Sequence, residues 1–391
     1  MKILKFLMAG CLVLAGIGVV GTGVTLGEMY QTNQIVYEAS DSEVLNQAAL
    51  ENVYIESDVP VRIMPTEGQA RVEFSASGQG LMIPEPKYNL EVTNEGKSSY
   101  INLKEVQGSE VYLFTNNIRQ ELVVYLPEKD INTLKVTNGV SSNYYGAQGF
   151  TYTSKANIKE LVLRVGRIDL DLKGNYGQMD IQARSGNMAI HSNTPAIVNV
   201  QGGNDVKLTG QLQQVTVKDS SNGGHNNVFI SSDIESKIDI DNSYSNVIIE
   251  EKVKDVTMTT NGGSLMVNSE SPYEVILNAN DQVDVNLKGK IERATIEGNY
   301  GQVKLYPTGT PKRIEVLGEQ MDVHAVLPAD ISGFEIKRKV EGYSEGEMGD
   351  FYADFEVKSE TINEQLRRIY FGDEAMKMFI GSTYGEVYIT K

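Results

Sequence analysis

The chain has 391 residues, of which 40% are hydrophobic, so it is long enough to bury a substantial core in two or three domains. Its formal net charge is −17, and this argues against DNA or RNA as a partner, because phosphate binding needs a concentrated basic surface. The 37 glycines and the many asparagines indicate a fold with many turns rather than a disordered tail.

The first feature in chain order is an apolar segment near the N-terminus. Lys2 and Lys5 precede it, and residues 6–27 carry no charge. As a helix this segment would be about 33 Å long, enough to cross a bilayer. The lysines before it and the acids after it predict a cytoplasmic tail (residues 1–5), a transmembrane signal-anchor (residues 6–27) and an extracytoplasmic remainder, and hence a single-pass protein of the cell membrane. A cleaved signal peptide is the alternative.

Residues 28–49 are interpreted as a linker, and residues 50–150 as a β-rich region that leads into a repeat array and caps it. This region contains less regular β segments such as VYIESDVPVRIM, Val53 to Met64, and ELVVYLPEKDINTLKVTNG, Glu121 to Gly139.

Residues 151–328 contain short runs of alternating apolar and polar residues, each bounded by Gly, Asn, Asp or Ser. The runs recur about every 9.5 residues, and pairs of runs recur about every 18 to 20 residues, which is typical of a β-solenoid or β-helix of two-stranded coils. The sequence GNYGQ begins at Gly174 and again at Gly298, and is one sequence variant of the turn that joins successive runs. An antiparallel β-sandwich is the alternative, because hairpins also place strands at this spacing.

Residues 329–391 are predicted to form an irregular segment followed by a C-terminal β cap. The charged part includes a short helix predicted at Thr361 to Arg368. The final FIGSTYGEVYITK returns to a strand-turn-strand pattern that closes the array, since the ends of such arrays need caps.

Together, these features resemble a bacterial family named putative adhesins, which are β-strand-repeat envelope proteins of unknown function. The resemblance rests on the N-terminal apolar segment, the strand pair VYIESDVPVRIM, the element LVVYLPEKDINTLKVTNG and the repeats YGQVKLY and YGEVYIT. It implies an N-terminal membrane anchor and a cell-envelope location, in some relatives together with envelope-stress regulators, and it implies no catalytic residues. The segment from Lys337 to Arg368 departs from the simple repeat.

No arrangement of residues in the sequence predicts catalysis or a metal site. The three histidines, His191, His225 and His324, lack metal-ligand spacing, and His191 and His324 fall at polar strand positions. The apolar segment contains GxGxxG without the surrounding βαβ unit that a dinucleotide requires. We therefore expect no cofactor, no metal ligand and no enzymatic activity.

Two alternatives stay open. The carboxylate pairs Asp169/Asp171 and Asp239/Asp241 fall on the outer face of their strands, where they would serve a glycosidase only if a cleft held them close together. The segments that begin at Gly202, Gly223 and Gly262 partly match the calcium β-roll repeat, but lack its second glycine and its aspartate at the required places.

Tyrosines at turns are the candidate binding residues. The chain has twenty tyrosines and no tryptophan. Tyr176, Tyr244 and Tyr300 each precede a strand, and could stack on sugars or contact a partner. Tyr176 precedes one strand of the coil and the other two precede the second strand, so we expect them on opposite edges; packing within turns is the competing interpretation.

The sequence thus predicts a membrane-anchored, extracytoplasmic β-solenoid that acts as a non-enzymatic binding or scaffold protein of the cell envelope. The expected partners are the membrane, through the N-terminal helix, and an envelope protein or a cell-wall or host-surface glycan. A carbohydrate-active enzyme acting on envelope or host polysaccharide is the alternative.

Overall fold

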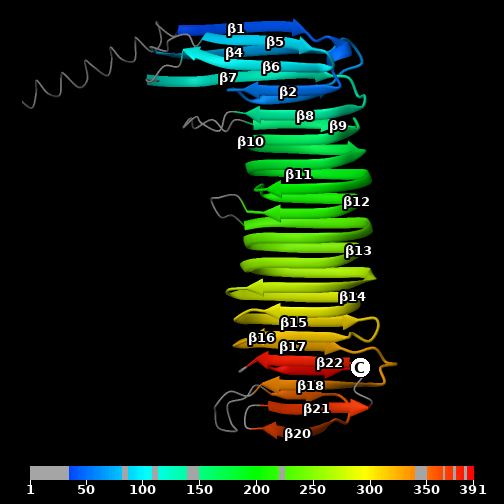
Figure 1. Cartoon of the computed structure of the whole chain (residues 1–391). Coiled ribbons are helices and arrows are strands. Elements are labelled where there is room, and N and C mark those ends of the chain that lie inside the picture. Colours follow the sequence, from blue (N-terminus) through cyan, green and yellow to red (C-terminus); the bar gives the residue numbers. More distant parts are fainter. Residues whose placement is uncertain are drawn as a thin grey trace, which may run out of the picture.

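The computed structural model describes residues 35–81, 87–107, 113–138, 149–219, 225–339, 350–363, 366–372, 376–382 and 385–391. Within these residues, twenty-three strands are joined by hydrogen bonds into one continuous sheet. Figure 1 shows an elongated molecule in which the strands lie across the long axis and are stacked along it. The predicted all-β class is confirmed.

The strands follow one another with one short 3-10 helix among the described residues, η1 (Gln47–Ala49). Their bounds are β1 (Ile35–Val44), β2 (Asn52–Ser57), β3 (Val61–Pro65), β4 (Arg71–Leu81), β5 (Lys87–Glu95), β6 (Ser98–Gln107), β7 (Leu113–Leu126), β8 (Ile131–Asn138), β9 (Gly149–Ser154), β10 (Ile158–Gly174), β11 (Tyr176–Gln201), β12 (Asp205–Lys218), β13 (His225–Ala279), β14 (Gln282–Glu297), β15 (Tyr300–Pro307), β16 (Arg313–Gly318), β17 (Gln320–Val326), β18 (Gly333–Lys339), β19 (Phe351–Ala353), β20 (Lys358–Asn363), β21 (Leu366–Gly372), β22 (Met376–Ser382) and β23 (Val387–Thr390).

The pairing of these strands forms two ladders, because the long strands β10 to β14 bend and contribute to both. The first ladder runs from β5 through β6, β2 and β8 to β14, β16, β22, β18, β21 and β20. The second runs from β1 through β4, β7, β3 and β9 to β15, β17, β23 and β19. Each strand in the middle of a ladder pairs in parallel with the next, as β10 does with β11 and β12 with β13.

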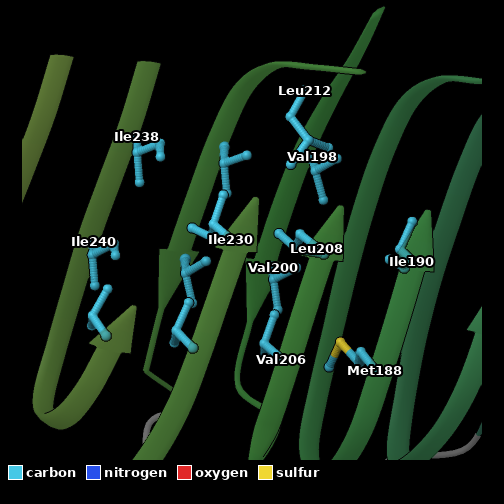
Figure 2. Close-up of a cluster of buried hydrophobic side chains, with 14 of the residues drawn as sticks. Met188, Ile190, Val198, Val200, Val206, Leu208, Leu212, Ile230, Ile238 and Ile240 are labelled. Atoms are coloured by element: carbon cyan, nitrogen blue, oxygen red, sulfur yellow. The ribbon is translucent and has the colours of Figure 1, made fainter. Parts of the chain in front are cut away.

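The core lies between the two ladders. Alternate residues of each strand point inward, as expected for a period of two, and Ile240 and Leu208 are 0% exposed. Figure 2 shows such side chains, among them Val198, Val200 and Leu208, packed between neighbouring strands. The inward residues of both ladders belong to one continuous hydrophobic cluster, so the outward residues of the first ladder and of the second face opposite sides of the molecule.

Glycine is required where a strand crosses closely over its neighbour. Gly263 has a φ of +125°, and a Cβ at this position would lie 2.1 Å from the carbonyl oxygen of Ser245. A side chain would therefore be strained by the backbone conformation and would also collide with the next rung.

Antiparallel strands end both ladders near the N-terminus and the first ladder near the C-terminus, whereas the second ladder ends at β19, which pairs in parallel with β23. At one end β1 pairs with β4, β4 with β7 and β5 with β6; at the other end β18 pairs with β21 and β21 with β20. The predicted short helix at Thr361 to Arg368 is wrong, because the described residues of that range belong to β20 and β21. The range expected to be a linker, residues 28–49, contains β1. The acidic side chains of β1 suit an edge strand, but they obscure the alternation of apolar and polar residues by which a strand is recognised in the sequence.

The predicted localisation, a single-pass membrane protein with an N-terminal helix, is corrected. In the part of the chain that the structure describes, no helix is long and apolar enough to cross a membrane. The predicted span itself, residues 6–27, lies outside the described residues.

Candidate functional site

The most distinctive outward surface lies on the second ladder near the C-terminus, where three strands repeat one residue pattern. Each carries an acid, an apolar residue and an aromatic residue in succession: Asp322-Val323-His324 in β17, Glu386-Val387-Tyr388 at β23 and Asp350-Phe351-Tyr352 at β19. Val323 and Val387 are 0% exposed. Because the middle residue points inward, the acid and the aromatic residue on either side of it point outward.

The register of these strands turns the repeated pattern into two columns. His324 pairs with Tyr388, and Tyr388 pairs with Tyr352, so the three rings occupy successive rungs. Val323 pairs with Val387, and Val387 with Phe351, so the acids one residue earlier are also neighbours. We name His324, Tyr388 and Tyr352 the aromatic column, Asp322, Glu386 and Asp350 the acidic column, and both together the acid–aromatic face.

The aromatic column is a continuous stack of rings. The ring centroids of His324 and Tyr388 are 4.5 Å apart with an interplanar angle of 24°, and those of Tyr388 and Tyr352 are 4.7 Å apart at 10°. Tyr352 is 45% exposed at the end of the stack. Such rings offer apolar area at little conformational cost, since they hold one another in place.

The acidic column is tied to the aromatic column by hydrogen bonds. The Tyr352 hydroxyl donates to Asp350 Oδ2 at 2.7 Å, and the Tyr388 hydroxyl donates to Glu386 Oε2. The hydrogen bond to Glu386, followed by desolvation, raises the pKa of Tyr388 to about 12, and the bond to Asp350 raises the pKa of Tyr352. Asp322 Oδ1 accepts from the Glu386 backbone N–H at 2.9 Å, which fixes the spacing between these two rungs.

The three tyrosines predicted from the sequence do not form a single site. Tyr176 is 1% exposed and lies inside the first ladder, where it pairs with Ile158. Tyr244 and Tyr300 are 42% and 43% exposed. Tyr300 pairs with Gln282 in the second ladder, and the Tyr244 ring lies against Gly262, so other rungs separate these two tyrosines.

The other sequence candidates are also dispersed. Asp169 and Asp171 are exposed on the second ladder, and Asp239 and Asp241 are exposed on the first, so the two pairs face opposite sides. His191 Nδ1 lies 3.0 Å from Thr209 Oγ1 within the second ladder. Among the described residues, no group of three or more His, Cys, Asp or Glu side chains is arranged to hold a metal ion.

The sequence interpretation missed Tyr352 and Tyr388, and placed His324 only at a polar position of a strand. The signal that could have found them is the triplet of acid, apolar and aromatic residues, which occurs as DVH at residues 322–324, DFY at 350–352 and EVY at 386–388, although EVY also occurs at 110–112. The three copies that form the face are not evenly spaced along the chain, and their strands stack in the order β17, β23 and β19. No repeat period could therefore reveal that they are neighbours.

Comparisons with known proteins give little beyond this geometry. No protein-family model matches the chain, and no curated protein matches it. Among solved structures, the crystal structure of a putative cell adhesion protein from Clostridium sporogenes is similar at 10% sequence identity, with a TM-score of 0.21. The match covers 90% of this chain and 99% of that chain. A similarity at this level does not establish a shared family, and the proposals below do not depend on it.

Proposed function

We propose that this chain is a β-solenoid of two-stranded coils that acts as a non-enzymatic binding or scaffold protein, with the acid–aromatic face as its recognition surface. Support for the solenoid comes from the parallel pairing of rungs such as Leu161 with Met179 and Val206 with Val228. A solenoid stacks each coil on the next, so it presents long columns of outward side chains.

The observation that carries the binding role is a stack of partly exposed rings, with Tyr352 exposed at its end, beside a row of carboxylates. Exposed aromatic side chains are enriched at interfaces, because they bury a large area and lose little entropy. The carboxylates offer acceptors along the same edge, and the hydroxyl bonds from Tyr352 and Tyr388 hold the rings in fixed positions before a partner arrives. A surface ordered in advance loses less conformational entropy on binding.

The proposal is tested by site-specific photocrosslinking in the native cell. A photoreactive amino acid at position 352 is expected to capture a defined partner, whether protein or glycan. The matched control is position 100, because Tyr100 is 38% exposed and stacked on Tyr54, but lies in the first ladder near the other end of the molecule, away from both columns. Equal capture at both positions, or none at position 352, would overturn the assignment of the face.

The proposed absence of catalysis has its own test. Envelope and host polysaccharides are incubated with the wild-type chain and with a variant that combines Asp169→Asn, Asp171→Asn, Asp239→Asn and Asp241→Asn. We expect no turnover by either protein. Turnover by the wild-type chain that the variant lacks would establish the enzymatic alternative and refute the non-enzymatic role.

A further inference from the structure

A row of cations lies on the opposite side of the molecule from the acid–aromatic face. Arg293 of β14 pairs with Arg313 of β16, and the pairing of Ile314 with Met378 places Lys377 on the next rung. The side chains of Arg293 and Arg313 are 58% and 66% exposed. We name Arg293, Arg313 and Lys377 the basic column.

The basic column and the acidic column occupy opposite faces of neighbouring coils. Four inward residues next to the two columns belong to the same buried cluster. Ile314 and Met378 follow members of the basic column in the sequence, and Val323 and Val387 follow members of the acidic column. Since β17 follows β16 in the chain, Arg313 and Asp322 lie in the same coil. The two columns therefore overlap along the long axis and differ by one rung.

The two columns match in repeat as well as in charge. Each has three like charges on successive rungs, and the spacing of both is set by the same distance between strands, about 4.8 Å. Like charges this close repel one another. Intramolecular ion pairs offset part of the repulsion, from Glu274 to Arg293 at 3.6 Å and from Glu315 to Arg313. Lys377 forms no ion pair with any described residue.

We propose that the acid–aromatic face of one copy of this chain docks against the basic column of a second copy. This inference names a partner for the recognition surface and so rests on the proposed function. The contact joins two different surfaces, so a docked pair leaves one face of each kind unoccupied, and further copies can add side by side into a row. The net charge of −17 opposes association at long range. Salt at physiological strength screens charges that are more than about 8 Å apart, so this repulsion is weakened, whereas the opposite charges of the two columns meet at shorter range.

Charge reversal on each face separately gives the sharpest test. The acidic-face variant combines Glu386→Lys and Asp350→Lys, and the basic-face variant combines Arg313→Glu and Lys377→Glu. In sedimentation velocity at physiological salt, we expect the full-length wild-type chain to self-associate and each variant to dissociate at least about tenfold more readily. An equimolar mixture of the two variants should associate again, because every contact between unlike variants pairs opposite charges.

The controls make the same changes of net charge elsewhere. Asp169→Lys with Asp171→Lys matches the acidic-face variant, and Lys159→Glu with Lys254→Glu matches the basic-face variant; all four native residues are exposed and lie outside the two columns. Both controls are expected to associate as the wild-type chain does. Melting curves of the column variants show whether they fold, and recovery of association in the mixture cannot arise from unfolded protein.

The result that overturns this inference is a wild-type chain that stays monomeric up to about 1 mM, the limit of weak association, or a mixture that does not recover association. Capture of a different partner by the crosslinker at position 352 would then leave the proposed function standing. Failure of both experiments would refute both proposals.

Discussion

The middle of the second ladder and its C-terminal end use one column of outward residues in two different ways. In the middle, the Asn227 amide donates to Asp205 at 2.7 Å, and the Ser264 hydroxyl donates to Asn246 at 3.0 Å. The same column continues through Asp284, Gln302 and Asp322 into the acidic column. The middle thus satisfies its polar groups between rungs, whereas the end places like charges on successive rungs beside exposed rings.

Under the proposed function, this difference separates the rungs that stabilise the fold from those that bind a partner. Rungs whose outward groups bond to one another have little left to offer a partner. The end of the ladder keeps carboxylates and a ring that is 45% exposed at Tyr352, which is the reason we propose it as the recognition surface. The predictions below change one region at a time, and they run from the largest expected effect to the smallest.

The largest loss of stability should come from a substitution that adds a side chain between two closely stacked rungs in the middle of the molecule. Gly263→Ala puts a Cβ 2.1 Å from the Ser245 carbonyl oxygen at a φ of +125°, and we expect a loss of more than about 3 kcal/mol in the free energy of unfolding. The control is Gly96→Ala in the turn between β5 and β6, where φ is +58° and no atom lies within 4 Å, with an expected loss of about 1 kcal/mol. Equal losses in denaturant unfolding would contradict the close stacking of rungs.

Deleting core volume should have the next largest effect. Leu208 is 0% exposed in the middle of the stack, and Leu208→Ala is expected to cost about 2–5 kcal/mol through lost burial and a residual cavity. Leu90 is 8% exposed in the edge strand β5, where the end of the sheet can relax, so Leu90→Ala should cost less. Chemical denaturation measures both variants, and a larger loss at Leu90 would reverse the comparison.

Alkaline titration distinguishes a buried tyrosine from one in the acid–aromatic face. Burial raises the pKa of Tyr152 to about 12 from the ordinary value of 10.0. A folded pKa above the unfolded one contributes stability that is fully present below pH 10 and is lost as the pH rises toward 12. The pKa of Tyr388 is also about 12, but chiefly because its hydroxyl bonds to Glu386.

The variant Glu386→Gln should therefore lower the pKa of Tyr388 and leave that of Tyr152 unchanged. NMR of the tyrosine ring carbons follows both groups in one titration. If the pKa of Tyr388 stays at about 12 in this variant, the link between the acidic and aromatic columns is wrong.

The smallest effects should come from removing single tyrosine hydroxyls. The Tyr273 hydroxyl donates to the Lys288 carbonyl at 3.0 Å, so Tyr273→Phe should cost about 1 kcal/mol. The Tyr176 hydroxyl is buried and has no hydrogen-bond partner among the described residues, so Tyr176→Phe should be neutral or slightly stabilising. Thermal unfolding of the two variants checks this order, and a destabilised Tyr176→Phe would contradict it.

The regular part of the fold could be predicted from the sequence because it depends on local pattern. Alternation places residues such as Val206 and Leu208 inward, and the structure buries both. The ends could not be predicted in the same way. Glu335, for example, is 6% exposed, and its carboxylate pairs with Arg368 at 2.7 Å across β18 and β21. A run of charged residues does not reveal that two of them meet over a sheet, so it was interpreted as irregular.

The two copies of GNYGQ show why the candidate site escaped the sequence analysis. Tyr176 in the first copy is 1% exposed, whereas Tyr300 in the second is 43% exposed. The first copy begins a strand of the first ladder beside Ile158, and the second begins a strand of the second ladder between Gln282 and Gln320. Identical local sequence therefore leads to burial or exposure according to the neighbouring rungs, whose paired residues lie about 18 to 20 positions away in the sequence.

The most direct test of the central claim, that recognition belongs to the C-terminal end of the second ladder, is chemical crosslinking in the native cell with three versions of the chain. These are the wild-type chain, a variant with Tyr352→Ala and Tyr388→Ala, and a variant with Tyr244→Ala and Tyr300→Ala, each checked for an unchanged melting temperature. The account predicts that crosslinked complexes disappear in the first variant and persist in the second. Complexes that persist in the first variant, or disappear only in the second, would contradict it.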